Sequence, residues 1–176
     1  RQFAGMVSQI SSEVNAAVMG VAGAKRVYAL MDEKKEEDHG HIRLVSVRDR
    51  NGVLEETDER TEMWAWKELK PNGEIVLKRL LGDVELCNVD FSYDGKRRIL
   101  KGINVFAHPG EKVAFVGATG AGKTTITNLI NRFYTIQKGQ IIYDGFDIYD
   151  ICLDDLRRSL GIILQDTVLF TGTVME

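Results

Sequence analysis

The sequence predicts an α/β fold with a long N-terminal helix, a small antiparallel β-subdomain and a core sheet that carries a glycine-rich loop. Three observations lead to this prediction. Residues 1–31 repeat apolar side chains at three- and four-residue spacing, which is typical of one face of a helix. Residues 84–91 alternate apolar and polar side chains, as a half-buried strand does. Residues 112–134 combine a short apolar run, a glycine-rich turn and an amphipathic stretch, which indicates a strand, a loop and a helix in that order.

The N-terminal stretch is rich in small residues as well as apolar ones. Alanine and glycine dominate residues 16–24, and such residues allow a second helix to approach closely. We therefore expect residues 1–31 to be a helix that packs against a partner. The segment has few basic residues, which argues against a freestanding amphipathic membrane binder. The charge-dense run 32–38, followed by Gly40, predicts the end of this helix and a solvated linker.

Residues 32–83 are predicted to be a linker and connector. Within them, Ile42–Val47 has the composition of a short strand. Trp64 and Trp66 flank an alanine, and we expect a pair of partly buried anchors rather than a docking patch. Pro71–Gly73 predicts a turn, because proline, asparagine and glycine each favour turn conformations.

The composition is that of an ordinary soluble chain with one sizeable core. It has 176 residues, of which 44% are hydrophobic and 28% charged. The net charge of −3 gives no sequence-wide basic field, so we expect no nucleic-acid partner. Cys87 and Cys152 lie far apart without metal-binding spacing, and we expect both to be reduced core cysteines. The chain begins at Arg1 and ends at Glu176 without a closing turn, so we expect both ends to be cuts through a longer protein.

The glycine-rich loop is the most informative motif. Gly117–Thr124 reads G-A-T-G-A-G-K-T and matches the phosphate-binding pattern G-x-x-x-x-G-K-[ST]. Lys112–Val116 before it predicts a short buried strand, and Thr125–Tyr134 after it predicts a helix. In this context, backbone N–H groups and a helix N-terminus attract phosphate. Lys123 adds a cation suited to the outer phosphates, and the Thr124 hydroxyl is of the type that can ligate Mg²⁺.

The remaining segments after residue 83 predict strands, turns and one short helix. Each has either an alternating pattern, a buried apolar run or turn residues. They are the strands Val84–Phe91 and Ile99–Phe106, the turn His108–Glu111, the strand and turn Gly139–Gly145, the short helix Leu153–Ser159 and the buried strand Gly161–Gln165.

From Val84 onward the chain resembles the nucleotide-binding domain of an exporter-type ATP-binding cassette (ABC) transporter. The markers of this resemblance follow one another in the family's order and spacing. They are the aromatic loop Val89–Tyr93, the strand Ile99–Ile103, the phosphate loop Gly117–Thr124, the Q-loop Leu164–Asp166 and the exporter-style continuation Leu169–Val174.

The resemblance implies a fold and a place in a larger protein. It implies a truncated P-loop NTPase core sheet with a small antiparallel β-subdomain, preceded by a long N-terminal α-helix. Residues 1–31 then resemble the cytoplasmic end of the last transmembrane-domain helix, residues 32–83 its connector, and residues 84–176 the N-terminal part of the nucleotide-binding domain. The implied location is the cytoplasmic side of the cell membrane. The implied partners are the transmembrane domain of the same polypeptide and a second half-transporter, in a homodimer or a heterodimer.

The resemblance also implies roles for individual residues, with ATP and Mg²⁺ as cofactors. The implied catalytic residues are Lys123 and Gln165, and the implied Mg²⁺ ligands are Thr124 and Gln165. The implied nucleotide-binding residues are Tyr93, which stacks on adenine, together with Gly117, Thr119, Gly120, Ala121, Gly122, Lys123, Thr124 and Thr125.

The full-length parent is expected to be an ATPase that couples ATP binding and hydrolysis to transport. In the family, the carboxylate motif that polarises water and the L-S-G-G-Q signature lie after the Q-loop, and neither follows Gln165 here. We therefore expect this chain to bind ATP without turnover. Two alternatives stay open at this point, namely a soluble P-loop kinase or hydrolase and a non-catalytic interaction module. The sequence does not indicate the transported substrate.

Overall fold

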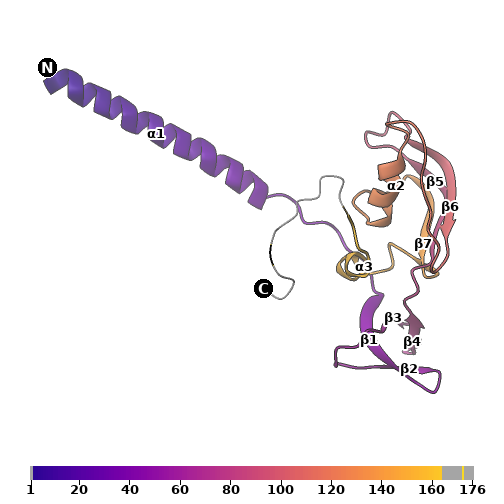
Figure 1. The fold of residues 1–176 in the computed structure, drawn as a ribbon. Coiled ribbons are helices and arrows are strands. Elements are labelled where there is room, and N and C mark those ends of the chain that lie inside the picture. The colour runs from indigo at the N-terminus through magenta and orange to yellow at the C-terminus, as the bar shows by residue number, and fades with distance from the viewer. Residues whose placement is uncertain (1, 164–171, 173–176) are drawn as a thin grey trace. The chain divides into compact units, whose positions relative to one another are not determined.

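A computed structural model of the chain describes residues 2–163 and Gly172 (Figure 1). The chain divides into two compact units, residues 1–37 and residues 38–176, and each is described by itself. Among the described residues, no helix combines the length and the apolar character that crossing a bilayer requires.

The first unit consists of one long helix, α1 (Gln2–Met31), which confirms the predicted N-terminal helix. Large apolar side chains along it, such as Ile10, Val14 and Tyr28, are exposed. That this helix packs against a partner stays a prediction. Residues 34–41, which follow it, form no helix or strand.

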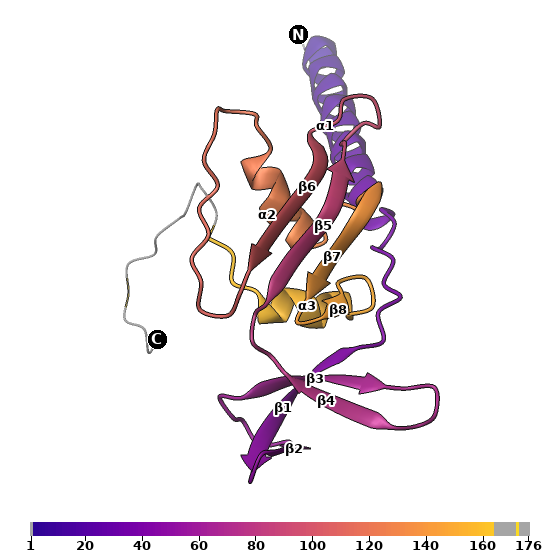
Figure 2. The same ribbon diagram turned by 90° about the vertical axis from the view of Figure 1, so that its right-hand side faces the viewer.

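The second unit begins with a four-stranded antiparallel sheet in the order β2-β1-β3-β4 (Figure 2). The strands are β1 (Arg43–Arg50), β2 (Val53–Glu56), β3 (Trp64–Leu69) and β4 (Ile75–Arg79). The predicted strand at Ile42–Val47 is therefore present and longer than expected, and the segment predicted as a connector folds into a sheet. We call this sheet the N-terminal sheet.

Tight turns connect the strands of the N-terminal sheet. Asn51 and Gly52 join β1 to β2, and both have positive φ, at 58° and 84°. That conformation is the two-residue hairpin turn that an Asn-Gly pair favours. The predicted turn at Pro71–Gly73 joins β3 to β4 and is confirmed, with the Gly73 N–H donating to the Lys70 carbonyl at 2.9 Å.

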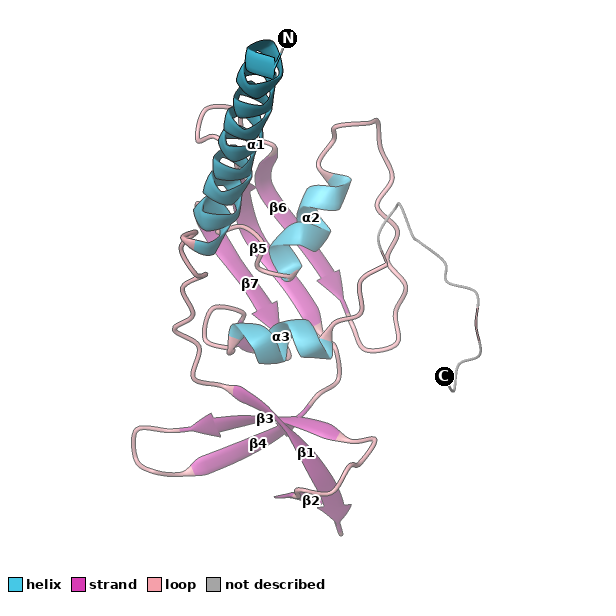
Figure 3. Cartoon of the chain, turned by 90° about the vertical axis from the view of Figure 1, so that its left-hand side faces the viewer, coloured by secondary structure: helices cyan, strands magenta, loops and turns pink. Residues whose placement is uncertain are grey.

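The second sheet has the order β6-β5-β7-β8 and is also antiparallel. Its strands are β5 (Val84–Phe91), β6 (Leu100–Ala107), β7 (Lys138–Tyr143) and β8 (Phe146–Asp147). They confirm the predicted strands in this region. Two helices, α2 (Lys123–Ile130) and α3 (Leu153–Ser159), lie on one face of this sheet (Figure 3). The predicted short helix has the observed bounds, whereas α2 begins earlier and ends earlier than the predicted Thr125–Tyr134.

One apolar core joins both sheets and both helices. Its members are the fully or largely buried side chains of strands β1, β3, β5, β6 and β7, of α2 and α3, and of the segments beside them. They are Ile42, Leu44, Trp66, Leu86, Val89, Phe91, Leu100, Ile126, Leu129, Ile141, Tyr143, Ile148, Ile151 and Leu156. The mixed α/β fold with a long N-terminal helix and antiparallel sheets is therefore the one that the sequence predicted.

Two predicted core strands are wrong for the described residues. Residues 112–116 and 161–163 have no regular secondary structure, and their apolar side chains are exposed, apart from Phe115, which is partly buried and packs against the core. The exposed fraction is 93% for Val116 and 90% for Ile163. A strand needs a neighbour to accept and donate its backbone hydrogen bonds, and among the described strands none pairs with either segment. Leu164 and Gln165, the end of the second predicted strand, lie outside the described residues.

The predictions for the tryptophans and for one of the two cysteines are confirmed, and the prediction for the other cysteine is wrong. Cys152 is buried, with its thiol 3.0 Å from the Gly40 carbonyl oxygen. Cys87 is exposed, so its prediction as a core cysteine is wrong. It lies where the β5 register shifts between Cys87 and Asp90, which breaks the alternation on which the prediction rested. Trp66 is fully buried and Trp64 half-buried, which confirms the pair of anchors.

The buried carboxylate of Asp144 joins the two sheets. It follows β7 and accepts hydrogen bonds from the Trp66 indole N–H at 2.9 Å and from the backbone N–H groups of Leu81, Gly82 and Asp83 at 3.1, 2.9 and 2.9 Å. The Trp66 ring also meets the Tyr143 ring edge-on, with centroids 5.7 Å apart. Burial raises the pKa of the Tyr143 hydroxyl, against a lowering hydrogen bond from Ser159. Asp144 thus fixes β3, an inner strand of the N-terminal sheet, to the end of β7.

The segment that leads into β1 is fixed to the start of α3. The N–H groups of His41 and Ile42 donate to the Asp150 carbonyl at 2.8 and 2.9 Å, and the Cys152 N–H donates to the Ile42 carbonyl at 2.9 Å. Asp38 accepts from the Leu153 N–H at 2.8 Å, at the N-terminus of α3. Burial raises the pKa of the Asp38 carboxyl, but its hydrogen bonds and the nearby Arg132 outweigh this effect and lower it.

Candidate nucleotide site

The glycine-rich loop ends where α2 begins, and two of its glycines are required by geometry. Gly120 and Gly122 have φ of 82° and 93°, in the left-handed region that side chains with a β-carbon disfavour. At Gly122 a β-carbon would also lie 2.8 Å from Leu100 Cδ2 and 3.2 Å from Ile99 Cγ2. Gly122 therefore allows the loop to pass close to the start of β6 and to turn directly into α2.

The N-terminus of α2 opens into a pocket of about 440 Å³. The unpaired N–H groups and the dipole of a helix N-terminus favour a bound anion. The pocket is lined by side chains and backbone of the loop, of α2 and of the segment between β5 and β6. These residues are Tyr93, Ile99, Thr119, Gly120, Gly122, Lys123, Thr124 and Thr125.

The pocket brings together most of the residues that the sequence predicted. Gly117 and Ala121 belong to the loop but do not line the pocket, and Gln165 lies outside the described residues. Ile99 lines the pocket although the sequence analysis did not predict it. Its position immediately before a predicted strand, close after the aromatic loop, is the signal that would have indicated it.

Lys123 places its ammonium group inside the curve of the loop. The Nζ atom donates to the carbonyl oxygens of Gly117 and Ala118, at 2.8 Å each. These two bonds hold the long side chain toward the loop instead of toward solvent. A phosphate oxygen at this position would gain a charge-assisted hydrogen bond, which is about twice as strong as a bond between neutral groups.

Tyr93 also lines the pocket and is fixed by three contacts. Its hydroxyl lies 3.1 Å from the hydroxyl of Thr125, the buried second residue after Lys123. Its ring packs edge-on against the rings of Phe91 and Tyr134, each with centroids 4.8 Å apart. Half of the side chain stays exposed, at 50%. The ring is therefore held in place while part of it is available to a flat apolar ligand.

The residues after Tyr93 form a tight turn around Asp94. Its carboxylate accepts from the N–H groups of Arg97 at 3.0 Å and Lys96 at 2.9 Å, and from the Ser92 hydroxyl at 3.1 Å. These hydrogen bonds, led by the one from Arg97, lower the pKa of the Asp94 carboxyl. Asp94 is thus ionised at neutral pH and shapes the loop that carries Tyr93 and Ile99.

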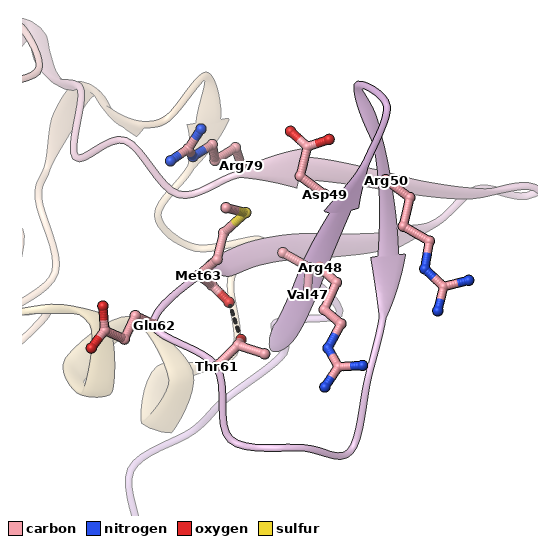
Figure 4. Close-up of a pocket in the computed structure, with 8 residues that line it drawn as sticks. All are labelled: Val47, Arg48, Asp49, Arg50, Thr61, Glu62, Met63 and Arg79. Carbon is pink, nitrogen blue, oxygen red and sulfur yellow. Dashed lines mark hydrogen bonds between the residues drawn. The ribbon is translucent and has the colours of Figure 1, made fainter.

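A second hollow, of about 660 Å³, lies in the N-terminal sheet and contains none of the predicted site residues (Figure 4). Its arginines do not converge on one point. Arg50 and Arg79 point away from one another in Figure 4, and Arg48 and Arg50 pair with Glu59 and Glu55. This hollow therefore lacks the focused charge of the pocket at the loop.

Comparison with known proteins identifies relatives of the chain. Residues 100–176 match the sequence model of the ABC transporter family. The chain is 36% identical over 176 residues to the fatty acid ABC transporter ATP-binding/permease protein of Mycobacterium bovis, covering all of this chain and 23% of that protein. It is 36% identical over 168 residues to the ATP-dependent lipid A-core flippase of Syntrophus aciditrophicus, covering 96% of this chain and 23% of that protein.

Among solved structures, a bacterial Atm1-family ABC exporter with ATP bound is similar to part of the chain. The sequence identity is 46%, the TM-score is 0.48, and the match covers 51% of this chain and 16% of that one. Residues 100–176 carry the domain of the ABC transporter family, and the chain is similar to part of the ATP-binding portion of exporter-type proteins. It spans about a quarter of the length of the curated relatives it matches.

Proposed function

We propose that this chain binds Mg-ATP in the pocket at the start of α2, and that the whole protein uses ATP binding and hydrolysis to drive transport across a membrane. The observation that carries the proposal is the pocket itself. In it, the Lys123 ammonium group, the N-terminus of α2 and the half-exposed Tyr93 ring surround one space. A cation and helix N–H groups suit a polyphosphate, and a fixed aromatic ring suits a base.

The proposed contacts follow the shape of the pocket. The backbone N–H groups of Gly120, Ala121 and Gly122 donate to the phosphates, with Gly117 and Thr119 shaping the loop around them. Lys123 exchanges its carbonyl partners for the β- and γ-phosphates. These residues bind and orient the phosphate chain, and the positive charge of Lys123 stabilises the charge that develops there during hydrolysis. Tyr93 then stacks on adenine, and Thr125 contacts the α-phosphate.

The site also fits a magnesium ion held together with ATP. Mg²⁺ is usually bound by one or two protein ligands together with phosphate oxygens and water. Thr124 presents a hydroxyl at the first turn of α2, on the wall of the pocket, and is one proposed ligand. Gln165 is the other, as a prediction from the sequence. The ion would neutralise part of the phosphate charge in the bound nucleotide.

The wider setting of the site is proposed from the relatives. Their names combine an ATP-binding part with a permease in one protein, or describe a flippase. We place the chain on the cytoplasmic side of the cell membrane, joined through α1 to a transmembrane domain of the same polypeptide. A second half-transporter, identical or different, would complete the functional pair. In this arrangement α1 is the cytoplasmic end of the last membrane-domain helix.

Turnover by the isolated chain is not expected. Phosphoryl transfer depends on positioning and on charge stabilisation around the attacking water. The glutamate and the signature motif that perform this in the family do not follow Gln165 in these residues. A steady-state phosphate-release assay tests this point. Turnover that Lys123→Ala abolishes would contradict it.

The first test of the proposal is the change Lys123→Ala. We expect the chain to bind Mg-ATP saturably in isothermal titration calorimetry, and the variant to bind at least about tenfold more weakly. The reason is the loss of charge-assisted hydrogen bonds, each contributing on the order of 1.5–3 kcal/mol. Lys70→Ala, at the β3–β4 turn, is the matched control and should leave the affinity unchanged. Equal affinity of the wild type and Lys123→Ala would refute the proposed site.

The second test is the change of Tyr93. We expect Tyr93→Ala to weaken ATP binding about 5- to 150-fold, because stacking of a base on an aromatic ring contributes on the order of 1–3 kcal/mol. Tyr93→Phe keeps the ring and loses only the contact with the Thr125 hydroxyl, so its affinity should stay close to that of the wild type. Competition titrations against a fluorescent ATP analogue measure both. An unchanged affinity of Tyr93→Ala would favour a soluble kinase-like site that holds adenine elsewhere.

A further inference from the structure

Four basic side chains gather on the segment that joins β5 to β6 and at the start of β6. Lys96, Arg97, Arg98 and Lys101 are all exposed, and together they line an open hollow of about 630 Å³. We call Lys96, Arg97, Arg98 and Lys101 the basic loop. Its residues do not line the candidate nucleotide pocket.

The basic loop lies beside the candidate nucleotide pocket. Tyr93 and Ile99, which line that pocket, belong to the same segment, and Ile99 stands between Arg98 and Lys101 in the sequence. The turn around Asp94 fixes the backbone at Lys96 and Arg97 through two hydrogen bonds. The positive charges are therefore held near the rim of the pocket by the same turn that supports its wall.

Little negative charge in the structure balances this loop. Arg98 forms an ion pair with Asp90 at 3.6 Å, whereas the Asp94 carboxylate receives backbone N–H groups. Within the described part of the chain, the side chains of Lys96, Arg97 and Lys101 have no hydrogen bond or ion pair. Residues 90–101 carry four cations against two carboxylates, in a chain whose net charge is −3. The loop is thus a local positive patch on an acidic protein.

We propose that Lys96, Arg97 and Lys101 attract the polyphosphate chain of the nucleotide and so accelerate its entry into the pocket. This inference rests on the proposed nucleotide site. Charges of one sign beside a cleft raise the association rate of an oppositely charged ligand by a factor of about 10 to 1,000. Exposed charges that do not contact the bound ligand act chiefly on association and are screened by salt. The basic loop therefore raises the association rate of ATP relative to that of uncharged adenosine, and it leaves the dissociation rate of ATP unchanged.

The test compares two triple variants that change the net charge equally. The first is Lys96→Gln, Arg97→Gln and Lys101→Gln. The control is Arg60→Gln, Lys70→Gln and Arg79→Gln, which removes three exposed cations from the N-terminal sheet and its connecting segments. Stopped-flow fluorescence measures the association and dissociation rates of N-methylanthraniloyl-ATP and of the corresponding uncharged adenosine derivative. Both are measured with the whole 176-residue chain, at low and at high salt. Circular dichroism verifies that each variant is folded.

We expect the first variant to associate with the ATP analogue about 3- to 10-fold more slowly at low salt, with a smaller difference at high salt. Its dissociation rate should stay within about twofold of the wild type, and the control variant should match the wild type. Association of the adenosine derivative should be unchanged in both. An unchanged association rate, an equal effect in the control, or a change confined to dissociation would overturn the inference. A wild type that binds no ATP analogue at all would instead refute the proposed nucleotide site.

Discussion

Replacing Asp144 with alanine is expected to lower the free energy of unfolding by about 3–5 kcal/mol, because a buried acceptor of four N–H groups is lost. Those donors are the Trp66 indole and the backbone of Leu81, Gly82 and Asp83. With the carboxylate removed, the buried Trp66 indole and the three backbone N–H groups lose their acceptor. Each buried donor left unsatisfied costs on the order of 1–3 kcal/mol. Urea unfolding followed by circular dichroism measures the change.

Two further variants show whether the loss comes from these bonds. Asp144→Asn keeps one acceptor oxygen and should fall between the wild type and Asp144→Ala. Trp66→Phe removes the indole N–H, so a double-mutant cycle with Asp144→Ala should give a coupling energy of about 1–3 kcal/mol. A loss below about 1 kcal/mol for Asp144→Ala would mean that the junction between the two sheets depends on packing rather than on this carboxylate.

Replacing Gly139 with alanine is expected to destabilise the chain by about 3 kcal/mol or more. Gly139 has φ of 93°, and a β-carbon there would lie 2.5 Å from the carbonyl oxygens of both Cys87 and Asn88. The contact is with backbone, so β5 and β7 would have to separate at the irregular step of β5. Overlap of this kind costs on the order of 1–3 kcal/mol in addition to the left-handed conformation.

Gly73→Ala is the matched control for this prediction. Gly73 has φ of 83°, close to that of Gly139, but nothing lies within 4 Å of where its β-carbon would be. It should therefore cost only the conformational penalty, about 1 kcal/mol. Equal losses for the two variants in thermal or urea unfolding would show that the close approach of β5 and β7 relaxes without cost.

The elements that the sequence predicted best are those whose pattern is local. The spacing in α1, the alternation in β5 and the small helix α3 can each be read from a few neighbouring residues. The N-terminal sheet was predicted only at its first strand. The Asn51-Gly52 pair is a hairpin signal from which β2 could also have been predicted. The pairing of β1 with β3, in contrast, joins distant segments, and no local pattern reveals it.

The predicted strands around the loop fail for a different reason. The apolar composition of residues 112–116 shows that they favour burial, but a strand also requires a partner with free backbone groups. For the site, the loop motif predicted most of the pocket because its chemistry is contained in consecutive residues. Ile99 was missed because an apolar wall residue has no chemical signature, and its place depends on how β6 begins beside the loop.

The attachment of residues 38–42 to the start of α3 has a mechanical consequence. The parallel bridge between Ile42 and Ile151, the neighbouring backbone bonds and the Asp38 carboxylate close residues 42–151 into a loop. Any tension that passes along the chain from residues 32–37 meets this closure first. Such a load is transferred to α3 through the hydrogen bond from Leu153 to Asp38. It also reaches the segment that follows α2, because Arg132 pairs with Asp38 at 3.5 Å. The N-terminal sheet lies inside the closed loop and is shielded from that force.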